Sequence, residues 1–153
     1  MKNFFRGVLF LIMIAVIVLQ FMKPEITNPP EDKSKFITAK VRVPETVQRK
    51  LELSCFDCHS YKTKLPWYSK ISPIVYLIKR DVDEGREHLN FSTWTDYNRK
   101  EMIDKLEEIE KKVKDEKMPL FMYKLLHPDA KLSKEEVKLI TEWARDSKEL
   151  LSK

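Results

Sequence analysis

Two cysteines and one histidine lie within five residues of this chain, in the run Cys55-Phe56-Asp57-Cys58-His59. This C-x-x-C-H spacing is the attachment signature of a c-type haem. Two thiols one helical turn apart can each form a thioether with a vinyl group of the porphyrin, and the adjacent histidine can bind the iron as proximal axial ligand. We therefore expect one covalently bound haem c per chain, held by Cys55, Cys58 and His59.

The iron also needs a ligand on the face opposite His59. Met118 directly precedes Pro119, just beyond a predicted helix, and such an extended Met-Pro step can present its thioether sideways. Methionine ligation would raise the reduction potential of the iron. We expect Met118 to be this sixth ligand, and the alternatives are His127, Met122 or an iron with no protein ligand there.

Aromatic residues follow the motif in a segment that prolines keep from forming a helix, residues 60–72. Trp67 and Tyr68 in this predicted loop are candidates for walls of a haem pocket, and the alternative is that they are ordinary core aromatics. The same loop is a candidate source of the backbone carbonyl that the second ring nitrogen of a proximal histidine usually contacts.

Other thiol and metal chemistry fits the pattern less well. A thioredoxin-like dithiol lies at a strand-to-helix turn, and no strand pattern flanks Cys55. A structural zinc site would need a further ligand such as His127, and three ligands within five residues crowd a tetrahedron. A simple disulfide would close a very short loop. No catalytic acid or base stands out, so we expect an electron carrier and not an enzyme.

The first 23 residues predict a membrane anchor. Lys2 and Arg6 precede an uncharged apolar run over residues 7–22, which is the pattern of a membrane-targeting segment. No pair of small residues follows for a signal peptidase, which favours an uncleaved helix over a cleaved signal. We expect a single-pass protein of the bacterial cytoplasmic membrane with its domain on the periplasmic face, where haem attachment of this kind occurs.

The rest of the chain predicts a short linker and one small all-α domain. Residues 24–42 contain three prolines and mixed charges, which favours an extended spacer that holds the domain off the membrane. In residues 43–153, only one glycine is present, which disfavours a sheet with many tight turns. Apolar periodicity and start signals predict helices over residues 44–55, 73–87 and 96–115, and a last helix from Ser133.

The charge of the chain indicates a solvated surface and no nucleic-acid partner. Charged residues make up 35% of the sequence, and the formal net charge is +5. Lysines and glutamates are interleaved along the predicted helices, often four residues apart, which is typical of an exposed helix face. No basic cluster is interleaved with aromatic residues, as nucleic-acid binding would require.

The order of helix, C-x-x-C-H motif, loop, helices, Met-Pro step and closing amphipathic helix resembles a class I cytochrome c. More closely, the stretches Cys55–Tyr68, Met118–Pro119 and His127–Trp143 resemble the bacterial haem-binding domain family, over most of residues 43–145. Members of that family are membrane-anchored proteins with a c-type-cytochrome-like domain. The resemblance implies covalent haem on Cys55 and Cys58, with His59 on the iron.

Together these observations predict a small cytochrome c-like domain behind a transmembrane helix, which exchanges single electrons with redox partner proteins. A haem-based sensor, a peroxidase-type site and a regulatory haem domain are the alternatives within the haem-binding class.

Overall fold

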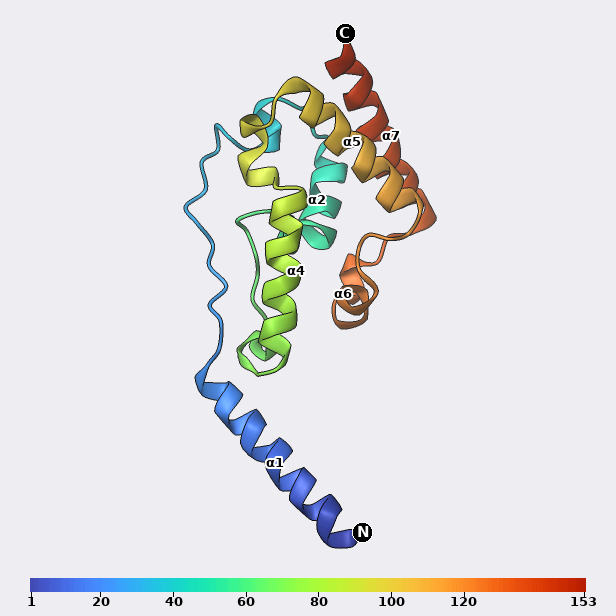
Figure 1. The fold of residues 1–153 in the computed structure, drawn as a ribbon. Coiled ribbons are helices and arrows are strands. Elements are labelled where there is room, and N and C mark those ends of the chain that lie inside the picture. Colours follow the sequence, from blue (N-terminus) through green and yellow to red (C-terminus); the bar gives the residue numbers. More distant parts are fainter.

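The computed structural model describes all 153 residues and contains helices but no β-strand (Figure 1). This confirms the predicted all-α fold. The α-helices are α1 (Lys2–Phe21), α2 (Glu45–Ser54), α3 (Phe56–His59), α4 (Ile74–His88), α5 (Arg99–Lys114), α6 (Phe121–Leu126) and α7 (Lys134–Ser152). Four short 3-10 helices join them: η1 (Ile37–Ala39), η2 (Trp67–Lys70), η3 (Phe91–Asp96) and η4 (Pro128–Ala130).

The core lies where α5 and α7 pack along each other and against α2. The predicted apolar face of α5 is buried along its whole length, and it consists of Met102, Leu106, Ile109 and Val113. From α7, Ile140 and Ala144 are fully buried, and the indole nitrogen of Trp143 donates a hydrogen bond to the carbonyl oxygen of Arg42 at 3.0 Å. Apolar residues three and four positions apart thus form one stripe on each helix, as amphipathic packing requires.

Capping residues determine where the long helices begin. Ser133 and Glu136 form a reciprocal capping box at the start of α7, as the sequence predicts. For α5 the same role belongs to Asn98 and Glu101, so this helix begins later than the expected residue 96. The reason is that residues 91–96 form η3, a separate turn that buries two large aromatic side chains in the core.

The segment expected to be a free spacer is bound to the domain. Phe36 and Ile37 are buried members of the core, so the packed domain begins before residue 43. Farther upstream, the Arg86 guanidinium donates hydrogen bonds to the carbonyl oxygen of Thr27 and to Oδ1 of Asn28, both at 2.8 Å. The linker therefore runs along the surface of the domain, because apolar anchors and an arginine hold it there.

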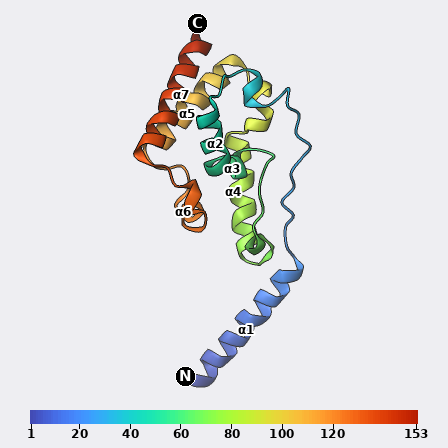
Figure 2. The same ribbon diagram turned by 180° about the vertical axis from the view of Figure 1, so that it is seen from behind.

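Helix α1 stands apart from the core and is apolar along its whole length. It has 20 residues, a mean hydropathy of 2.4 over its most apolar window, and no buried residue. Both views show it projecting from one end of the domain (Figures 1 and 2). By length and composition this helix could span a membrane, although a signal sequence would have the same properties.

Candidate haem-binding site

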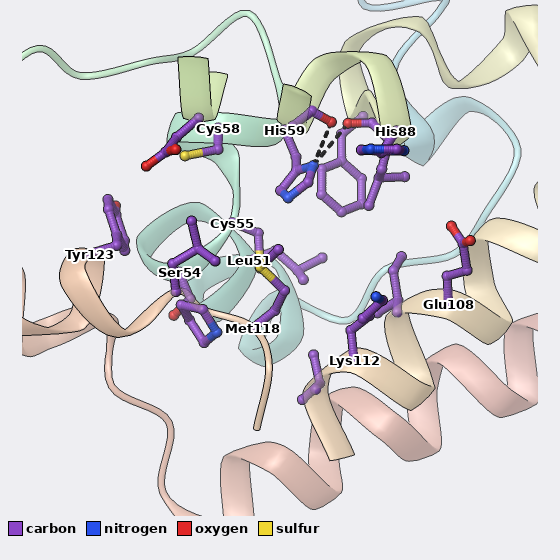
Figure 3. Close-up of a pocket in the computed structure, with 18 of the residues that line it drawn as sticks. Leu51, Ser54, Cys55, Cys58, His59, His88, Glu108, Lys112, Met118 and Tyr123 are labelled. Carbon is purple, nitrogen blue, oxygen red and sulfur yellow. Dashed lines mark hydrogen bonds between the residues drawn. The ribbon is translucent and has the colours of Figure 1, made fainter. Parts of the chain in front are cut away.

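The C-x-x-C-H motif occupies the junction between α2 and α3. Cys55 ends α2, and its carbonyl oxygen accepts hydrogen bonds from the backbone N–H of Cys58 at 3.2 Å and of His59 at 2.9 Å. This single helical turn directs both cysteines and the histidine toward one cavity, and Met118 lines the same cavity (Figure 3). The structure therefore brings together the four residues that the sequence predicts as ligands and attachment points.

The orientation of His59 leaves one ring nitrogen available for a metal. Its Nδ1 lies 2.8 Å from the carbonyl oxygen of Gly85 and 3.0 Å from that of Leu89 (Figure 3). Carbonyl oxygens only accept hydrogen bonds, so Nδ1 carries the proton and the lone pair is on Nε2. Burial lowers the pKa of His59, which keeps the ring neutral. These are the properties of a histidine prepared to bind iron.

The carbonyls that hold His59 come from the end of α4 and not from the loop over residues 60–72, which was only a candidate source. The carbonyl oxygen of Gly85 already accepts a hydrogen bond from the backbone N–H of Leu89 at 2.9 Å, so the contact with His59 uses its second lone pair. The C-terminal turn of α4 crosses α3 closely enough for the carbonyl oxygens of Gly85 and Leu89 to reach Nδ1 of His59.

That close crossing requires a glycine at position 85. A Cβ atom added to Gly85 would lie only 2.6 Å from the carbonyl oxygen of Cys58, which is a backbone atom. Gly85 lies within α4, which continues to His88. The physical reason for this glycine is therefore the approach of two backbones, which no larger residue permits.

The cavity next to the motif has a volume of about 340 Å³, within the range of small-molecule pockets. Its walls are mainly apolar, from α2, α5 and the segments that follow α4 and α5, and include Leu51, Leu89, Phe91, Ile109, Val113, Pro119 and Leu120. Four charged side chains and a second histidine also line it: Asp81, Glu84, Glu108, Lys112 and His88. An apolar cavity with a neutral histidine and two thiols on one side fits a flat, largely apolar porphyrin.

Met118 reaches this cavity because the chain reverses sharply after α5. Glu116 has a φ of 55°, and the backbone N–H groups of Lys117 and Met118 both donate to the carbonyl oxygen of Lys112, at 3.0 and 3.2 Å. No other methionine lines the cavity. The alternative candidate Met122 is exposed on α6.

Trp67 and Tyr68 do not line the cavity, contrary to the sequence analysis. Trp67 is 78% exposed, and the Tyr68 hydroxyl lies 3.1 Å from Nε2 of His127, a residue that does not line the cavity either. The reason is the length of α4. Both aromatics belong to η2, which packs near the start of that helix, whereas His59 contacts its end.

Tyr123 is the site residue that sequence reasoning missed. It lines the cavity, and its hydroxyl donates a hydrogen bond of 2.7 Å to Oδ2 of Asp57, inside the C-x-x-C-H motif. Burial, and then this hydrogen bond, raise the pKa of Tyr123. No sequence signal links positions 57 and 123, because the contact exists only once α6 has folded back onto α3.

The protonation of the two thiols and the position of His127 bear on the dithiol and zinc alternatives to a haem site. Burial raises the pKa of both Cys55 and Cys58 to about 12, so both are protonated at neutral pH. Redox-active dithiols have the opposite property, a lowered thiol pKa. No group of three or more His, Cys, Asp or Glu side chains is arranged to hold a metal ion, and His127 is turned toward Tyr68. Neither the dithiol nor the zinc alternative is supported by this geometry.

Comparison with known proteins agrees with the geometry of the site. A family model described as a haem-binding domain matches residues 14–146, which extends from within α1 to within α7. No curated protein and no solved structure matches the chain at a significant level. The match includes the C-x-x-C-H motif, all the residues that line the cavity and the first part of α7. The chain therefore belongs to the haem-binding domain family.

Proposed function

We propose that this haem-binding chain carries one covalently attached c-type haem and acts as a one-electron carrier at the outer face of the bacterial cytoplasmic membrane. The observation that supports this most is the convergence of both thiols and the unprotonated Nε2 of His59 on one apolar cavity. Helix α1 is the proposed single-pass anchor, because it is long and apolar enough to span a bilayer.

In this proposal Cys55 and Cys58 provide the covalent attachment. Each thiol would hold one vinyl group of the haem as a thioether, with its S–H bond added across the vinyl C=C bond. This addition needs no net oxidant or reductant. Because the thiols are protonated in the folded protein, attachment is expected before the cavity closes or with the help of maturation proteins.

His59 and Met118 are the proposed axial ligands. The carbonyl oxygens of Gly85 and Leu89 hold the His59 ring by its Nδ1–H, which keeps Nε2 free. Met118 approaches the same cavity from the segment between α5 and α6. When bound, haem supplies an iron centre that gains and loses one electron. If His59 and Met118 both held the iron, the group would supply electron-transfer chemistry more readily than peroxidase or sensor chemistry.

The decisive experiment is expression of the full chain with and without the cytochrome c maturation machinery. We expect haem to stay on the polypeptide under denaturing conditions only when the machinery is present. The C55S/C58S double variant should lose this covalently bound haem completely. A matured wild-type chain that releases all its haem on denaturation would contradict the proposal. In that outcome the chain would be a haem-binding protein without covalent attachment.

A further inference from the structure

The end of α1 is hydrogen-bonded to the domain. The Ser72 hydroxyl donates to the carbonyl oxygen of Leu19 at 2.8 Å, and the Gln20 side-chain amide exchanges two hydrogen bonds with the Ser72 backbone, at 3.1 and 3.2 Å. The Tyr76 hydroxyl donates to the carbonyl oxygen of Met22 at 2.6 Å. The segment that joins η2 to α4 is therefore held at the point where the proposed anchor would leave the bilayer.

Large apolar side chains are exposed next to this point. On η2, Trp67 is 78% exposed. On α6, four apolar residues are between 51% and 73% exposed, and they are Phe121, Met122, Leu125 and Leu126. The hydrogen bond between Tyr68 and His127 connects η2 to the end of α6. Figures 1 and 2 place α6 and the start of α4 at the end of the domain from which α1 leaves.

Basic residues border these apolar side chains. Lys124, Lys131 and Lys134 line a second cavity of about 480 Å³ together with Phe121 and Leu125. Soluble monomers seldom expose apolar patches of this kind without a partner. Tryptophan beside apolar side chains and lysines is characteristic of protein surfaces at a membrane interface. Lysines near such a surface are attracted to anionic lipid headgroups.

We propose that this basal surface, defined as Trp67, Phe121, Met122, Leu125 and Leu126, lies against the lipid headgroups of the membrane that α1 spans. The inference rests on the proposed anchor. It commits to lipid and not to a protein partner because the surface lies toward the end of the domain that is hydrogen-bonded to the end of α1, so membrane insertion would bring it to the bilayer. Tyr123 lines the haem cavity from the same helix, so this contact would hold α6 in place over the cavity and orient the domain.

Spin labels on the full matured chain in anionic nanodiscs test the basal surface. Single cysteines are introduced by W67C, F121C and L125C, with E149C at the far end of α7 as the matched water-exposed control and I12C as a probe of α1. Power saturation then compares collisions with oxygen, which is enriched in lipid, and with a nickel chelate, which is enriched in water. The unsubstituted chain gives the background labelling, and retained haem absorbance verifies folding.

We expect labels at positions 67, 121 and 125 to favour oxygen several-fold more than the label at position 149. If they match position 149 while position 12 is lipid-like, the basal surface is not a membrane contact, although the anchor stands. A water-exposed apolar surface of this kind would then be assigned to a protein partner. If position 12 is also water-like, the anchor itself is absent and the proposed membrane location fails.

Discussion

The ring of His59 is held in place by two backbone carbonyl groups. Two backbone carbonyls accept the proton of its Nδ1, and the cavity surrounds the remaining ring nitrogen. Both thiols lie within one helical turn of it, Cys58 on α3 and Cys55 at the junction of α2 and α3. At this scale the two cysteines and the histidine form one side of a preformed cavity, and Met118 from another segment lines the same cavity.

Replacing Met118 by alanine tests the second axial ligand. We expect the M118A variant to keep covalently bound haem but to lose the Met-to-iron charge-transfer band in the ferric spectrum. Loss of a methionine ligand should also lower the reduction potential. M122A is the matched control, because Met122 is exposed on α6 and should leave the spectrum unchanged. A charge-transfer band that persists in M118A would exclude Met118 as the ligand.

Substitution of Gly85 tests the close crossing of α3 and α4. The added methyl group of G85A would lie 2.6 Å from the carbonyl oxygen of Cys58, so one backbone must shift and the hydrogen bond to His59 must lengthen. Overpacking of this kind should lower the free energy of unfolding by about 3 kcal/mol, measured by chemical denaturation.

The chain offers a matched control in its only other glycine. A Cβ atom on Gly7 would meet nothing within 4 Å, so G7A should unfold like the wild type. If G85A also matches the wild type in stability and haem content, the crossing is looser than the geometry indicates.

Among the elements, the turn after α5 matters most for the site. Glu116 adopts a left-handed conformation there, with φ of 55°, and this reversal brings Met118 to the cavity. A residue with a Cβ is strained in this conformation, which is why glycine commonly occupies the position that follows a helix.

Replacing Glu116 by glycine should relieve this strain and stabilise the protein. E116G should raise the free energy of unfolding by about 1 kcal/mol, because glycine adopts positive φ without steric cost. E116A is the control, since alanine keeps the Cβ and should not stabilise the protein. The measurement is chemical denaturation of both variants with the haem spectrum recorded in parallel. Destabilisation by E116G would mean that the glutamate side chain makes a compensating contact.

At the scale of the whole molecule, the free energy of unfolding depends on pH through the thiols of Cys55 and Cys58. In the haem-free chain, burial raises the thiol pKa values from 9.0 to about 12. The unfolded chain therefore loses thiol protons at lower pH than the folded chain does. The stability that the protonated thiols contribute is fully present below pH 9 and is lost as pH rises from 9 toward 12.

Denaturation of the haem-free protein at a series of pH values measures this loss. The C55S/C58S variant controls for the lysines and tyrosines that titrate in the same range, and it should lose stability less steeply above pH 9. The matured protein should resemble this variant, because its sulfur atoms are in thioethers and have no proton to lose. Parallel curves for wild type and variant would show that the thiols are not buried in the haem-free state.

Local signals were sufficient for most of the helical architecture. The apolar residues three and four positions apart in α5 and the Ser133–Glu136 capping box of α7 depend only on residues within one or two turns, and both predictions are confirmed. The start of α5 was placed too early because Thr95 and Asp96 are good capping residues. Burial of the aromatics of η3 in the core decided otherwise, and burial is not a local property.

For the site, the sequence by itself determined the C-x-x-C-H run and named Met118, because both are patterns of adjacent residues. Only the tertiary structure decided which groups surround them. It brought the end of α4 to His59 and Tyr123 to Asp57, and it left Trp67 at the opposite end of α4 from the histidine. Contacts between distant segments depend on how the helices cross, and a pattern along the chain does not encode that crossing until the core has formed.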